Sequence, residues 1–172
     1  MPANVARVPS MATDPRQIVA LLTARAATVA TAESLTGGRL AAALTSVPGA
    51  SACVTGGVVA YATRVKVDVL GVPADLVAEH GVVSGECAAA MATGVRALLR
   101  TTYAMATTGV AGPDQQEGHP AGHVWVAVAG PEGVETRLLA LRGDRSAVQE
   151  ATCRHALSVL EGMLTREEPA LG

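Results

Sequence analysis

The sequence is short of charge. Of its 172 residues only 16% are Asp, Glu, Lys or Arg, against 49% that are hydrophobic, and the formal net charge at pH 7 is -2. A chain this apolar and this weakly charged is not intrinsically disordered. Binding to phosphate groups needs a clustered excess of Lys and Arg, so the charge balance argues against nucleic acid as a partner. The length fits a single globular domain.

Long hydrophobic runs and paired cysteines are also missing. No apolar run reaches the roughly 18 residues of a membrane-spanning helix, and the first residues lack the apolar block of a secretion signal. These absences predict a cytoplasmic protein without membrane partners. Cys53, Cys87 and Cys153 form no CxxC pair and are expected to be buried as small apolar side chains. His119 and His123 straddle a proline and a glycine, so no helix presents them together and no metal site is expected.

Lysine is nearly absent. Lys66 is the only lysine among 13 basic residues. A position that keeps lysine against this bias is expected where the chemistry needs an amine that can lose its proton, which arginine cannot do. The alternative is chance, since a single lysine must fall somewhere.

Alternating strand and helix patterns predict an α/β fold with Asp14, Ser84 and Asp144 as helix N-caps. The expected strands are 28–32, 54–61, 103–108 and a hairpin of 123–130 with 134–141; the expected helices are 15–25, 39–46, 63–70, 73–79, 84–100 and 144–163. The prediction is a three-layer α/β/α sandwich with a mixed, mainly parallel sheet. Residues 1–13 are expected to be a flexible arm, 14–163 the domain and 164–172 a polar tail.

Polar turns that contain glycine follow two of the expected strands, at 33–38 and 107–114. Ligands of open α/β sheets bind at the carboxyl ends of the strands, so the two turns together form the candidate site. A sharp strand-to-helix turn would present the Ser34 hydroxyl, and the N–H groups of residues 36–38 would bind an oxyanion or a phosphate. The alternative is that Ser34 or Thr36 only caps the helix, which is the commoner role of such residues.

Two further polar side chains are expected at the same strand ends. Tyr61 ends the second strand and Lys66 lies five residues on, in surroundings apolar enough to let a desolvated lysine act as a base near neutral pH. The alternative is a surface lysine beside a core tyrosine. The hydroxyls and backbone donors of 107–114 suit a ligand, although Gly-Pro-Asp is also ordinary turn chemistry.

Five motifs occur in the order and approximate spacing of the CinA C-terminal domain family, which the chain resembles over residues 14–162. They are Thr31–Gly38, Tyr61 with Lys66 and Gly71–Val72, His80–Ser84, Thr108–Asp114, and Gly143–Arg145. The chain departs from the family pattern at Gln115 and Gln116, where glycines are usual, and at His119 and His123, where Lys and Thr are usual.

The resemblance implies a fold like that of anticodon-binding domains and the hydrolysis of nicotinamide mononucleotide to nicotinate mononucleotide and ammonia. Ser34 would be the nucleophile, with Tyr61 and Lys66 assisting, and neither a metal nor an organic cofactor is expected. The expected substrate-binding residues are Glu33, Thr36, Gly37, Gly38, Thr107, Thr108, Gly109, Ala111 and Gly112. The alternative is a catalytically inactive nucleotide-binding or competence- and DNA-damage-associated regulatory module. Association into a homo-oligomer is left open.

Overall fold

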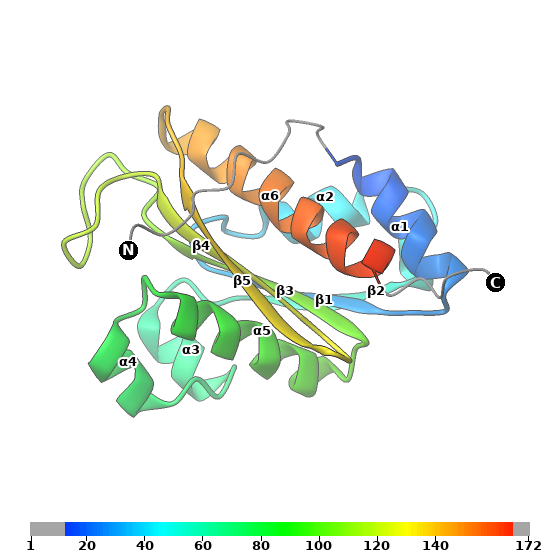
Figure 1. The fold of residues 1–172 in the computed structure, drawn as a ribbon, viewed down its shortest axis with the longest axis horizontal. Helices are drawn as coiled ribbons and strands as arrows, with labels where there is room; N and C mark the ends of the chain where they lie inside the picture. Colours follow the sequence, from blue (N-terminus) through cyan, green and yellow to red (C-terminus); the bar gives the residue numbers. More distant parts are fainter. Residues whose placement is uncertain (1–12, 167–172) are drawn as a thin grey trace.

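The computed structural model describes residues 13–166, which form one five-stranded sheet between two layers of helices (Figure 1). The strands are β1 (Val29–Glu33), β2 (Val54–Val59), β3 (Tyr103–Gly109), β4 (His123–Gly130) and β5 (Gly133–Ala140). The helices are α1 (Pro15–Ala24), α2 (Arg39–Thr45), α3 (Thr63–Asp68), α4 (Ala74–His80), α5 (Gly85–Leu99) and α6 (Arg145–Arg166), with a short 3-10 helix, η1 (Ala50–Ala52).

The sheet has the order β2-β1-β3-β4-β5. Strands β2, β1 and β3 run parallel, whereas β4 is antiparallel to both of its neighbours, β3 and β5. A tight turn joins β4 to β5. Helices α1, α2 and α6 cover one face, and α3, α4 and α5 cover the other (Figure 1). The predicted three-layer α/β/α sandwich with a mixed sheet is confirmed.

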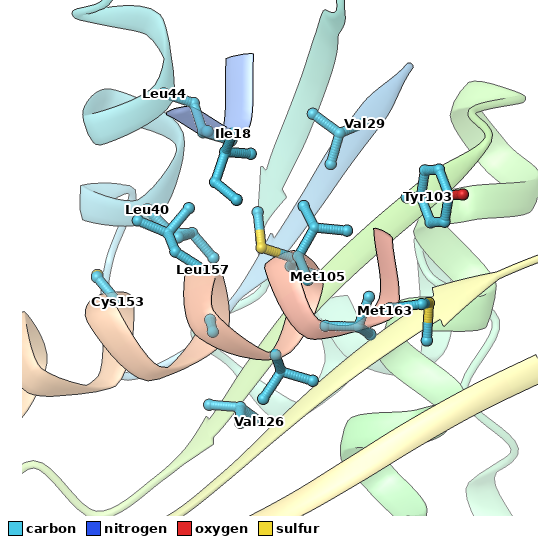
Figure 2. Packing of buried hydrophobic residues seen from close by; sticks show 14 of the residues in the cluster. Ile18, Val29, Leu40, Leu44, Tyr103, Met105, Val126, Cys153, Leu157 and Met163 are labelled. Atoms are coloured by element: carbon cyan, nitrogen blue, oxygen red, sulfur yellow. The ribbon is translucent and has the colours of Figure 1, made fainter. Parts of the chain in front are cut away.

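One face of the sheet carries large side chains and the other carries small ones. On the α6 side, Val29, Met105 and Val126 pack against leucines and a methionine of α1, α2 and α6, such as Leu157 and Met163 (Figure 2). The alternate positions, which face α5, are almost all alanine: Ala30, Ala32, Ala104, Ala106, Ala127 and Ala129. Since strand side chains alternate between faces, this pattern lets α5 lie close to the sheet.

At two glycines the neighbouring chain lies so close that a side chain would not fit. A Cβ on Gly94 of α5 would lie 1.9 Å from the Leu70 carbonyl oxygen, and one on Gly57 of β2 would lie 2.2 Å from Thr31 Oγ1. The register of β2 against β1 shifts just before Gly56. Strand β2 then ends at Val59, two residues earlier than predicted.

Side-chain caps begin three helices where the sequence predicts them. Asp14 accepts a hydrogen bond from Arg16 N, Ser84 from Cys87 N, and Asp144 from Ala147 N. Helix α6 runs to Arg166, past the predicted end near residue 163. No helix among residues 13–166 has the length and apolar character needed to cross a membrane.

The start of the described chain is tied to α6. Thr13 is buried, and its hydroxyl donates a 2.8 Å hydrogen bond to Glu161 Oε2. Residues 1–12 and 167–172, which hold most of the predicted arm and tail, lie outside the described residues.

The three cysteines are buried and free, as predicted. Burial raises the pKa of the Cys87 thiol to about 11 and that of the Cys153 thiol to about 12. Both thiols are therefore protonated at neutral pH and serve as apolar packing groups.

Candidate active site

The two predicted turns meet where β1 and β3 end side by side. The amide of Ser34 donates a 3.0 Å hydrogen bond to the Thr107 carbonyl, which joins the turns directly. Beside them lies a cleft of about 430 Å³, within the range of small-molecule sites. Its lining comprises Ser34, Leu35, Tyr61, Val82, Val83, residues 108–116 and Arg145.

Ser34 and Lys66 form a buried pair at this cleft. Nζ of Lys66 lies 3.0 Å from Ser34 Oγ, although the two residues are 32 apart in the chain. Lys66 is 1% exposed, whereas Ser34 is 9% exposed and lines the cleft. Helix α3 directs its lysine inward beneath the serine, so the side chain is not at the surface.

Burial makes the Lys66 amine easier to deprotonate. The apolar surroundings lower the pKa of Lys66 from the ordinary 10.5, and the smaller influences of Cys87 and Glu117 act in the opposite direction. The Ala60 carbonyl accepts from Nζ at 2.7 Å, and the Tyr61 carbonyl lies at 3.5 Å. Carbonyl oxygens accept only, so a neutral amine that donates to them directs its lone pair toward the Ser34 hydroxyl.

Tyr61 has its hydroxyl at the rim of the cleft. The side chain is 61% exposed, and its hydroxyl accepts a 2.8 Å hydrogen bond from Arg145 Nη2. The group of Tyr61 that lies near Lys66 is the backbone carbonyl. The structure thus brings Tyr61 to the cleft, as predicted, with its phenol paired to an arginine.

Arg145 is a site residue that the sequence prediction did not include. It is the first residue of α6, and its Nη1 donates a 2.8 Å hydrogen bond to the Gly112 carbonyl. It therefore links the Gly-rich loop to Tyr61 across the mouth of the cleft. The Gly143–Arg145 motif, which includes the N-cap Asp144, contains this residue. However, the sequence does not show that the helix begins beside the other two turns.

Glu33, which is predicted to bind substrate, does not line the cleft. Its carboxylate is buried and accepts hydrogen bonds from Thr36 Oγ1 at 2.7 Å, Leu40 N at 2.8 Å and Ala41 N at 3.0 Å. Thr107 completes the cluster through a 2.8 Å contact between its hydroxyl and that of Thr36. A carboxylate at the first turn of α2 satisfies N–H groups that would otherwise lack partners.

The backbone N–H groups of residues 36–38, which are the predicted anion donors, likewise do not line the cleft. Thr36 is fully buried, Gly37 N donates to the Ser34 carbonyl at 3.1 Å, and Gly37 and Gly38 have φ of 58° and 101°. Among residues 13–166, the amide of Leu35 donates to no protein group, and Leu35 lines the cleft. This N–H directly follows Ser34, which is the position that supplies an oxyanion donor in nucleophile elbows.

Of the other predicted binding residues, Thr108, Gly109, Ala111 and Gly112 line the cleft. The Thr108 hydroxyl donates to the Val82 carbonyl at 2.7 Å, which fixes the β3 end against the loop before α5.

The Glu117 carboxylate also holds the loop before α5 in place. Its two carboxylate oxygens accept hydrogen bonds from Val82 N at 3.1 Å and Val83 N at 3.0 Å. Val82 and Val83 line one side of the cleft, and Asp114–Gln116, just before Glu117, line another. One carboxylate thus holds two cleft walls together.

The two loop histidines come together, although no helix carries them both. The rings of His119 and His123 stack with centroids 4.2 Å apart. Among residues 13–166, no group of three or more His, Cys, Asp or Glu side chains could hold a metal ion.

The sequence is similar to those of several known proteins. The chain is 51% identical over 147 residues to a CinA-like protein of Frankia casuarinae, an alignment that covers 86% of this chain and 34% of that protein. It is 47% identical over 137 residues to a putative competence-damage inducible protein of Desulforamulus reducens, covering 80% of this chain and 33% of the relative. The chain therefore spans about a third of the length of these curated relatives.

Solved structures of similar chains share the fold over nearly their whole length. A CinA superfamily protein from Klebsiella pneumoniae superposes with a TM-score of 0.85 at 36% identity, covering 90% of this chain and 99% of that one. One from Escherichia coli gives a TM-score of 0.87 at 29% identity, covering 95% and 99%. The family model of the CinA C-terminal domain matches residues 12–164, and the chain belongs to that family.

Proposed function

We propose that the protein is an amidohydrolase that converts nicotinamide mononucleotide to nicotinate mononucleotide and ammonia through a seryl acyl-enzyme. The observation that carries the proposal is the buried Ser34–Lys66 pair, 3.0 Å apart, at a cleft with Arg145 at its mouth. A serine next to a desolvated amine is an activated nucleophile without a histidine.

The first half of the reaction releases ammonia. Ser34 Oγ attacks the carboxamide carbon while neutral Lys66 takes the hydroxyl proton. In this proposal the Leu35 N–H stabilises the oxyanion, and such donors are typically worth about 2.7–4 kcal/mol. The C–N bond then breaks, and the Lys66 ammonium gives its proton to the departing nitrogen. The products are ammonia and an ester of nicotinate mononucleotide on Ser34.

The second half regenerates the enzyme. A water molecule attacks the ester carbon, and Lys66 accepts one proton from it. The bond between the carbonyl carbon and Ser34 Oγ breaks, and Oγ takes the proton back from Lys66. The product acid releases the remaining water proton to solvent, and nicotinate mononucleotide leaves as its carboxylate.

The substrate phosphate is assigned to Arg145. This guanidinium holds Gly112 and Tyr61 through two nitrogens and has further N–H donors. It begins a helix of 22 residues, and helix N-termini attract anions. We assign the phosphate to Arg145 rather than to residues 36–38 because Arg145 lines the cleft and residues 36–38 do not.

Release of ammonia from nicotinamide mononucleotide by the purified protein tests the proposal. We expect ammonia and nicotinate mononucleotide in equal amounts and loss of both in Ser34→Ala. We expect no change in Ser51→Ala, which removes an exposed hydroxyl of η1 that does not line the cleft. Binding of the nucleotide without ammonia release would instead favour the regulatory alternative.

A further inference from the structure

Strand β5 forms a free edge of the sheet. It pairs with β4 on one side, and no described residue pairs with it on the other. The strand is eight residues long, so a row of backbone N–H and C=O groups faces outward. Natural edge strands are usually short, charged or covered, because an open edge is a template for another strand.

The side chains of β5 make this edge suited to pairing. On the α5 side, Val134 and Leu138 are each 43% exposed and Thr136 between them is exposed, so this face of the strand has no charge. On the α6 side lie Glu135 and Arg137, which are half-buried. Glu135 pairs with Arg166 of α6. Burial lowers the pKa of His155 of α6, and the charges of Arg154 and Arg137 lower it further, so Arg137 lies near this helix.

The order of these side chains is self-complementary. Two antiparallel copies of β5 related by a two-fold axis keep the same face of each sheet on the same side, and opposite residues then point the same way. With the axis at Thr136, Glu135 of each copy faces Arg137 of the other, and Val134 faces Leu138. An axis at residue 135 would instead bring two carboxylates together, and one at residue 137 two guanidinium groups.

We propose that the β5 edge is a dimer interface, where a second copy of this chain adds its own β5 antiparallel and centred on Thr136. The two five-stranded sheets become one continuous ten-stranded sheet. The partner is another copy of this chain because the strand matches itself in charge, with two Glu–Arg pairs on one face, and in apolar contacts on the other. This inference does not depend on the proposed reaction.

Sedimentation of the purified full chain across the micromolar concentration range tests the interface. The wild-type chain is expected to dimerise reversibly. Glu135→Arg alone places two arginine pairs face to face, and Arg137→Glu alone places two glutamate pairs face to face. Opposite like charges are destabilising, so each variant should raise the dimer Kd about ten-fold or more.

A mixture of the two charge-reversal variants gives the most specific test of the pairing. An equimolar mixture of Glu135→Arg and Arg137→Glu chains restores both opposite-charge pairs in the heterodimer, as does the double variant with itself, so both should dimerise like the wild type. Arg166→Gln controls for the lost contact of Glu135 with α6, and Glu132→Arg for a charge change in the turn; both should leave the Kd nearly unchanged.

Val134→Lys provides an independent variant, since it disrupts the apolar side of the interface without altering the charged side. It should weaken the dimer even if one charge reversal fails to fold. A wild-type chain that stays monomeric would overturn the proposal. A dimer that survives both charge reversals and Val134→Lys would overturn it as well, because its interface would lie elsewhere, and so would a mixture that fails to restore association.

Discussion

Replacing Lys66 by arginine separates a proton-transfer role from a purely electrostatic one. Arginine keeps the positive charge but stays protonated at any working pH. In the structure Nζ is enclosed by Ser34 Oγ at 3.0 Å and the Ala60 carbonyl at 2.7 Å, with 1% of the residue exposed. A guanidinium is larger and would still have no lone pair to offer the serine.

The expected loss is that of a positioned base, about 10²–10⁴-fold in kcat. At about 1.4 kcal/mol per factor of ten, this corresponds to roughly 3–6 kcal/mol of barrier. Lys66→Arg should therefore be nearly as damaging as Lys66→Met, which keeps the length of the side chain and removes the amine. Arg64→Gln, an exposed change on the same helix, should leave kcat unchanged.

The assay is ammonia release from nicotinamide mononucleotide as a function of pH. Because burial lowers the pKa of Lys66, the wild-type rate should rise with pH as the amine loses its proton, and this acid limb should vanish or shift in the variants. If Lys66→Arg keeps most of the activity with the same acid limb, Lys66 is not the base and another group must activate Ser34.

Three further predictions concern residues around the Ser34–Lys66 pair, and a fourth concerns Lys66 itself. Arg145→Gln should raise KM for nicotinamide mononucleotide far more than for nicotinamide riboside, and equal effects on both substrates would remove Arg145 from phosphate binding. Glu33→Gln replaces the carboxylate that accepts from two N–H groups of α2 with an amide, and it should lower the free energy of unfolding in urea by about 1–3 kcal/mol. An unchanged urea midpoint would show that the carboxylate does not stabilise the start of α2. Glu117→Ala removes the acceptor of Val82 N and Val83 N and should raise KM more than it lowers kcat, whereas a loss confined to kcat would show that the clamp does not shape binding. Since the folded-state pKa of Lys66 lies below 10.5, the unfolded chain binds the extra proton between these values, so wild-type stability relative to Lys66→Met should increase as pH rises toward 10.5; a flat difference would mean that the lysine is not desolvated.

Local patterns predicted the framework because they depend on neighbouring residues. Asp14, Ser84 and Asp144 cap their helices through contacts two or three residues away, and alternation in the strands reflects the two faces of the sheet. The Ser34 turn and its lysine were predicted by strand-end reasoning and by the rarity of lysine. Their 3.0 Å contact is a tertiary fact that agrees with that reasoning.

The directions of side chains in the turns were not predictable in the same way. Glu33 precedes Ser34, yet alternation along β1 sends the two to different surroundings, and the carboxylate turns to the N–H groups of α2. The phenol of Tyr61 depends on Arg145, which is 84 residues away in the chain. No local pattern shows which distant side chain will complete such a pair.

The proposed acyl-enzyme on Ser34 can be detected directly by mass spectrometry of acid-quenched protein during turnover. We expect a peptide containing Ser34 that carries the mass of nicotinamide mononucleotide less ammonia, and no such adduct in Ser34→Ala. An adduct on a different residue, or steady ammonia release by Ser34→Ala, would contradict it.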